Sequence, residues 1–144
     1  MNHLAVWIDD LLSTMEDNSN QNIISVIEAC GEKCAHRTGM LARITELKTE
    51  SSQCKNHAEI VQFLSKHLPG SITQVDDGLI IHAVEGKCSC KMEPENFTHS
   101  SMLCNCTKGY HKAIWSEFFG RPVEVEIIET ILRGSNECIF KIII

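Results

Sequence analysis

Apolar residues recur at helical spacing through the first half of the chain. Positions three and four apart carry them in four segments, at residues 4–15, 22–30, 33–48 and 56–67. Gly31 is placed to end the second segment, Asn56 to cap the fourth, and Pro69-Gly70 to end it. We therefore expect residues 1–70 to be mainly helical.

The hydrophobic period changes after Gly70. Stretches that are rich in β-formers, or that alternate between apolar and polar side chains, predict strands at residues 79–84, 88–92, 123–132 and 138–144. A helical pattern at residues 107–119, ended by Gly120, interrupts them. The sequence thus predicts one α+β domain over residues 1–144. Its helical N-terminal half packs on an antiparallel β-sheet, with one helix inserted before the final β-hairpin.

Charge and hydropathy exclude two classes of partner. The chain has 144 residues and a net charge of −6, and no basic run is interleaved with aromatic residues, so we expect no nucleic-acid surface. No apolar run reaches the roughly 18 residues that span a bilayer, and no basic, apolar leader opens the sequence. We expect a cytoplasmic protein without a membrane segment, whose eight cysteines are reduced thiols.

Two Cys-x-Cys motifs, Cys88/Cys90 and Cys104/Cys106, carry the clearest chemistry. In an extended strand, residues two apart face the same way, so each motif would present both sulfurs on one face. If the two segments pair, four thiols converge. Four thiolates suit zinc and, as a weaker alternative, an iron–sulfur cluster. The predicted metal ligands are therefore Cys88, Cys90, Cys104 and Cys106.

Two other interpretations of these cysteines stay open. Cysteine behaves as a small hydrophobic residue, so alternating cysteines also fit a buried sheet face. Neighbouring thiols can instead cycle through a disulfide, which would make the chain a thiol redox protein. Cys30 and Cys34 would share a helix face only if the helix continues through Gly31, and the sequence does not decide whether they join the site.

Cys106 and His111 are the candidate catalytic residues. Cys106 comes directly before the predicted helix 107–119, whose positive end would lower the pKa of its thiol and make it nucleophilic. His111 lies about one turn further along and could serve as a base or a ligand, although a plain surface histidine is the simpler interpretation.

Short motifs from Cys88 onward resemble a known group of domains. Besides the two Cys-x-Cys motifs they are Cys104-Asn-Cys106-Thr-Lys-Gly109-Tyr110, Gly120-Arg-Pro122-Val123-Glu124-Val125, Ile131-Leu132-Arg133-Gly134 and Cys138-Ile139-Phe140. Together they are similar to the 4-vinyl reductase, or hydrocarbon-binding, domains and to proteins like 2-aminothiazoline-4-carboxylate hydrolase. The match is confined to the C-terminal third.

The resemblance implies a helical part packed on an antiparallel sheet, a homodimer, and a small organic ligand held in an internal cavity. It also implies zinc bound by cysteines near the final hairpin. Cys138 matches the last of these cysteines, whereas Leu132 stands near the place of an earlier one and cannot bind a metal. A metal would have to use the Cys-x-Cys motifs instead.

Two main functions follow from these observations. The first is a small-molecule-binding or sensing domain that also holds zinc through cysteines. The second is a small hydrolase acting on an organic substrate, with Cys106 or a metal-bound water as nucleophile. Catalytic zinc keeps an open coordination position, whereas four cysteines would close the shell, so the sequence favours the binding domain.

Overall fold

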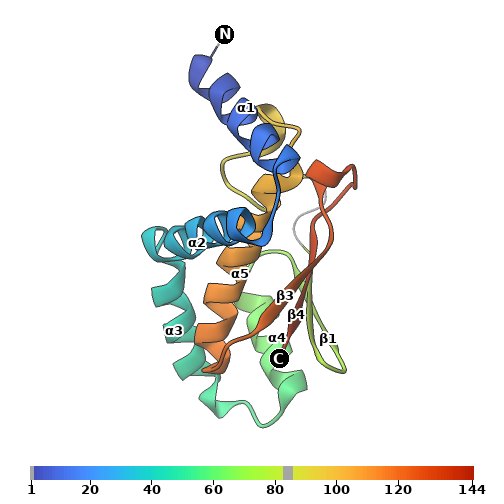
Figure 1. Ribbon diagram of the computed structural model, residues 1–144. Helices are drawn as coiled ribbons and strands as arrows, with labels where there is room; N and C mark the ends of the chain where they lie inside the picture. The colour runs from blue at the N-terminus through green and yellow to red at the C-terminus, as the bar shows by residue number, and fades with distance from the viewer. Residues whose placement is uncertain (1, 83–85) are drawn as a thin grey trace.

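The computed structural model describes residues 2–82 and 86–144. Its helices and strands, in chain order, are α1 (His3–Asp17), α2 (Gln21–Arg37), α3 (Met40–Glu50), α4 (His57–His67), β1 (Ser71–Val75), β2 (Gly78–His82), α5 (Cys104–Phe119), β3 (Glu124–Glu129) and β4 (Ile139–Ile143) (Figure 1). Helices come first and α5 is inserted before the last two strands, so the predicted α+β architecture is confirmed. The predicted strand end at Val84 lies outside the described residues.

The sheet is antiparallel, with the strand order β1-β2-β4-β3. β1 and β2 form a hairpin, and β4 lies inside the sheet because it pairs with both β2 and β3. Side chains alternate along β4, so Phe140 and Ile142 are fully buried while Ile139 and Lys141 remain partly exposed. This buried face of the sheet forms one wall of the core.

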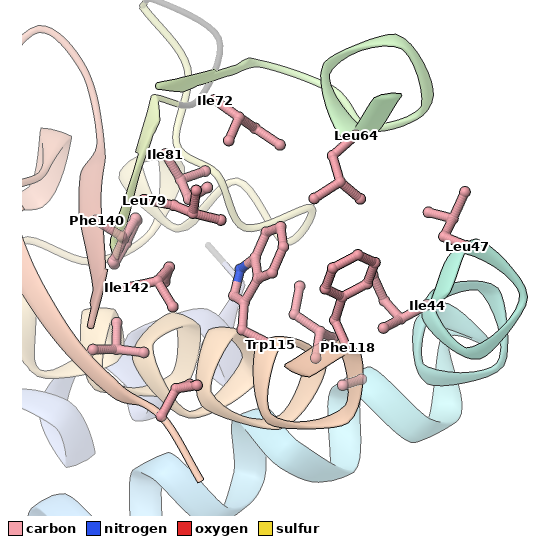
Figure 2. Close-up of a cluster of buried hydrophobic side chains, with 14 of the residues drawn as sticks. Ile44, Leu47, Leu64, Ile72, Leu79, Ile81, Trp115, Phe118, Phe140 and Ile142 are labelled. Carbon is pink, nitrogen blue, oxygen red and sulfur yellow. The ribbon is translucent and has the colours of Figure 1, made fainter. Parts of the chain in front are cut away.

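α5 is the central element of the fold. It contacts α2 and α3 on one side and β3 and β4 on the other (Figure 1). Figure 2 shows Trp115 and Phe118 extending from α5 among apolar side chains of the sheet and of α3 and α4. Trp115 is 1% exposed. Because an aromatic side chain buries a large apolar area, this helix contributes much of the hydrophobic stabilisation of the fold.

α2 and α5 cross in backbone contact through two glycines. A β-carbon added at Gly31 would lie 1.8 Å from the carbonyl oxygen of Cys106, and one added at Gly109 would lie 1.9 Å from the carbonyl oxygen of Glu28. Gly31 was expected to end a helix, but α2 runs through it to Arg37, so that prediction was wrong. The glycine allows the close approach of a second helix, for which any side chain is too large.

Three predicted boundaries also differ from the structure. Residues 88–92 were expected to form a strand but lie in an irregular loop, where the N–H of Glu93 closes a turn onto the carbonyl of Cys90. α5 begins at Cys104 instead of 107, because a 3₁₀ turn at Ser101–Leu103 leads directly into it. The helix expected at 33–48 is divided between α2 and α3 by Gly39, which has a φ of 79°.

α1 is attached to the loop before α5. Its buried Leu12 packs with Ile27 and Met102, and the carboxylate of Glu16 accepts hydrogen bonds from the hydroxyls of Ser100 and Ser101. The outer face of α1, including Trp7, is exposed. Within the described residues, no helix combines the length and the apolar character needed to cross a bilayer.

The glycine crossing yields the first testable prediction. Ala is intrinsically better than Gly in a helix by about 1 kcal/mol, so Gly31→Ala and Gly109→Ala would stabilise an uncrowded helix. Here each added methyl group meets a backbone oxygen that cannot move without separating the two helices. We expect each variant to lower the free energy of unfolding by about 3 kcal/mol or more, measured by urea denaturation.

Glu32→Ala is the matched control, because Glu32 is exposed on the same turn of α2 as Gly31. Its free energy of unfolding should stay within about 0.5 kcal/mol of the wild type. A Gly31→Ala protein as stable as Glu32→Ala would show that the two helices are not in backbone contact.

Candidate functional site

Four of the cysteines line one small cavity. Cys88 and Cys90 reach it from the loop after β2, Cys104 from the first turn of α5, and Cys138 from the residue before β4. The cavity has a volume of about 10 Å³. That is roughly the space that a single water molecule needs, so the cavity as it stands holds no organic ligand.

Cys88 and Cys138 influence each other's protonation within this group. The thiol of Cys88 donates a hydrogen bond to the sulfur of Cys138, which lowers the pKa of Cys138 to about 6 and raises the pKa of Cys88. Cys104 is bonded differently, because its thiol donates to the hydroxyl of Thr130 at 3.3 Å. Burial raises the pKa of Cys104, although the Thr130 hydroxyl opposes the effect.

Cys106 lies away from the cavity. Residues two apart on a helix point in nearly opposite directions, so Cys106 packs near α1 and α2 instead of beside Cys104. Burial, followed by the nearby thiols of Cys90, Cys34 and Cys30, raises the pKa of Cys106 to about 12. Desolvation of the thiolate thus opposes the helix-dipole effect expected at Cys106, and a reactive Cys106 stays a prediction.

The four predicted metal ligands are thus only partly assembled. Cys88, Cys90 and Cys104 share the cavity, with Cys138 in the place expected for Cys106. In the described parts of the chain, residues 2–82 and 86–144, no group of three or more His, Cys, Asp or Glu side chains is arranged to hold a metal ion. Zinc binding stays a prediction. Measuring the zinc content of the Cys138→Ser and Cys106→Ser proteins would test it.

His111 is the polar side chain that sequence reasoning misplaced. It was expected at the surface, but it is 8% exposed and lies on the face of α5 that meets the sheet. Its Nδ1 accepts a hydrogen bond from the indole Nε1 of Trp115 at 3.3 Å. Its ring lies 4.7 Å from the ring of Phe140 and 5.7 Å from that of Tyr110, measured between centroids.

Burial lowers the pKa of His111 to about 4, so the ring is neutral near pH 7. Because Nδ1 accepts the Trp115 bond, the proton of the neutral ring is on Nε2. No described residue accepts a hydrogen bond from Nε2, so this donor is available to another acceptor. His111 bonds to Trp115 and not to Cys106, so the two candidate catalytic residues do not form a nucleophile–base pair.

A signal in the sequence could have placed His111 correctly. It stands three, four and seven residues before Ile114, Trp115 and Phe118, which is the spacing of one helix face. All three of these residues are buried. A histidine in register with an apolar stripe belongs to the core face of the helix.

A larger groove lies on the outer side of α5. It has a volume of about 710 Å³ and is lined by α2, α5 and the residues after Gly120. The carboxylate of Glu28 in this groove forms ion pairs with two lysines. It lies 3.3 Å from Nζ of Lys108 and 3.8 Å from Nζ of Lys112. The ligand cavity was expected between the helices and the sheet, where the core side chains are packed instead (Figure 2).

The neutral state of His111 gives a pH-dependence prediction. The unfolded histidine titrates near 6.5, whereas the folded one titrates near 4, so between these values the unfolded chain binds a proton that the native protein does not. Stability from this group is complete above pH 6.5 and falls as the pH drops toward 4, by about 3 kcal/mol in all. Urea unfolding across this range measures it.

His111→Gln serves as the comparison for that measurement, because its side chain does not titrate. The difference in unfolding free energy between wild type and variant should change with pH only between about 6.5 and 4. Parallel curves for the two proteins would contradict a buried, neutral His111.

Two solved structures were compared with the chain. The phenol-responsive sensory domain of the transcription activator PoxR, solved with phenol, is similar in fold, with a TM-score of 0.51, 12% identity, and coverage of 96% of this chain and 73% of that one. Subunit 3 of a trafficking protein particle complex from Naegleria fowleri, covalently bound to palmitic acid, gives a TM-score of 0.42, 15% identity, and coverage of 97% and 92%. At 12% identity, the likeness to the PoxR domain concerns the fold alone.

The sequence comparisons are more limited. No curated protein matches the chain. Membership of the 4-vinyl reductase group, which the C-terminal motifs suggest, stays a prediction, because the family model that matches is another one. That model is the family of unknown function DUF6144, and since it matches residues 1–144, the chain belongs to the DUF6144 family.

Proposed function

We propose that this chain is a small-molecule-binding domain whose ligand is a small aromatic compound with a polar oxygen, bound at His111. One observation carries the proposal: a neutral histidine on the core face of α5 has an N–H donor that bonds no described residue and lies among aromatic rings. A ligand oxygen could accept a hydrogen bond from this Nε2.

The chemistry of the surroundings defines the ligand class. Phe140, Tyr110 and Trp115 offer ring faces and edges to another aromatic ring, and His111 Nε2 offers one hydrogen bond. Phenol has one ring and one oxygen, and the PoxR sensory domain, of similar fold, was solved with phenol. This likeness supports a sensing or binding function for the present chain over the hydrolase alternative.

Ligand entry requires the core to open. The cavity beside Phe140, at about 10 Å³, is far smaller than a benzene ring. Cys88, Ser89 and Cys90 line it from residues 86–93, which belong to neither the sheet nor the helices. We place the ligand entrance at this loop, because displacing it leaves the strand pairing and the α2–α5 crossing intact.

Fluorescence provides a direct test. The chain has two tryptophans, and Trp7→Phe leaves Trp115, bonded to His111, as the only reporter. Titration of this protein with phenol should give a saturable change in Trp115 emission. His111→Gln in the same background should weaken phenol binding about tenfold, as expected for loss of one buried hydrogen bond worth about 1.4 kcal/mol.

Three controls separate the outcomes. Toluene, which lacks the oxygen, should bind the Trp7→Phe protein more weakly than phenol does. The two compounds should bind equally to the His111→Gln variant of this protein. Lys112→Gln, in the outer groove, should leave phenol binding unchanged. Phenol binding that is lost in Lys112→Gln and kept in His111→Gln would place the ligand in the groove and contradict the proposal.

A further inference from the structure

The loop after β2 is held beside the end of the final hairpin at two successive points. The N–H of Gly86 donates a hydrogen bond to the carbonyl of Asn136 at 3.0 Å. Two residues further along each segment, the thiol of Cys88 bonds the sulfur of Cys138. Both residues also line the same small cavity. The backbone bond and the shared cavity are independent observations, and both bring the same two segments together.

Cys88 and Cys138 are the two thiols placed to react with each other. Both are free. Cys104, another thiol of the cavity, donates its hydrogen bond to the hydroxyl of Thr130 instead. The side chain of Cys138 is 1% exposed, while Cys88 is only half-buried, so an oxidant from solvent approaches the pair from the side of Cys88.

We propose that Cys88 and Cys138 form a reversible disulfide when a peroxide oxidises the protein. The two sulfurs, which line one cavity of about 10 Å³, must approach to about 2 Å for the bond. The shift falls on residues 86–93, which lack helix and strand hydrogen bonding, while Cys138 stays at the start of β4. The proposal concerns a modification site and does not depend on ligand binding at His111.

The oxidation balances with hydrogen peroxide as the only other reactant. One of the two sulfurs attacks one peroxide oxygen, the O–O bond breaks, and a sulfenic acid and one water form. The other sulfur then attacks the sulfenic sulfur, the S–S bond forms, and the S–O bond breaks to release a second water. The two thiols lose two electrons to the peroxide, and their two protons leave in the waters.

The disulfide would join the loop to the strand that carries the proposed ligand site. Cys138 and Phe140 are two residues apart and both buried, so they lie on the same side of the chain, and Phe140 packs on His111. The bond fixes residues 86–93 against this strand. The covalent link closes a chain segment of some fifty residues, so it should raise the Tm by roughly 5–10 °C.

Peptide mapping of the oxidised full chain tests the proposal. The protein is treated with hydrogen peroxide in EDTA, so that no bound metal protects the thiols, then alkylated and digested with trypsin. Cleavage after Lys87, Lys91, Arg133 and Lys141 isolates residues 88–91 and 134–141. We expect these two peptides to be linked, and dithiothreitol to release them.

Cys90→Ser and Cys88→Ser form a matched pair, because they change the same peptide and lie in the same loop. The link should persist in Cys90→Ser and disappear in Cys88→Ser. Circular dichroism confirms that both are folded before oxidation.

Three outcomes would overturn the proposal. The first is a link that survives in Cys88→Ser. The second is an oxidised wild type in which Cys138 is joined to Cys104 or is still alkylated. The third is a linked protein whose Tm is lower than that of the reduced protein. The last would show that the native structure holds the two sulfurs apart.

Discussion

The backbone contact between α2 and α5 at Gly31 and Gly109 is the constraint on which the other features depend. Helices that carry side chains at a crossing are separated by about 8–10 Å, and these two approach until a single methyl group would meet a carbonyl oxygen. The contact thereby fixes both the distance of α5 from α2 and the rotation of α5 about its own axis. Its rotation decides which of its residues face the sheet and which face solvent, and so it decides the chemistry of every side chain on this helix.

The rotation of α5 gives Cys104, Cys106 and His111 different surroundings. Cys104 meets Thr130 near the sheet, and His111 meets Phe140 on β4. Cys106 faces α2, with Cys30 and Cys34 nearby, and its thiol is stabilised in the protonated form. These three candidate residues of the sequence are therefore in three separate environments.

The beginning of β4 connects the proposed ligand site with the proposed oxidation site. Cys138 and Phe140 are both buried, one against the loop after β2 and the other against His111. A change in the loop therefore reaches the aromatic surroundings of the histidine through two residues of one strand. Packed interiors transmit such displacements because they contain little free volume. This proximity gives a physical route by which oxidation could alter ligand binding.

The sequence by itself determined the α+β class, the helical first half, the Asn56 cap and the helix that ends at Gly120, because these follow from hydrophobic period and local capping. It did not determine the role of Gly31 or the environment of the cysteines. A glycine that ends a helix and one that admits a neighbouring helix look alike in sequence. Likewise, local spacing says nothing of desolvation, so only the tertiary structure could bring Cys88 to Cys138, raise the pKa of Cys106 and bury His111.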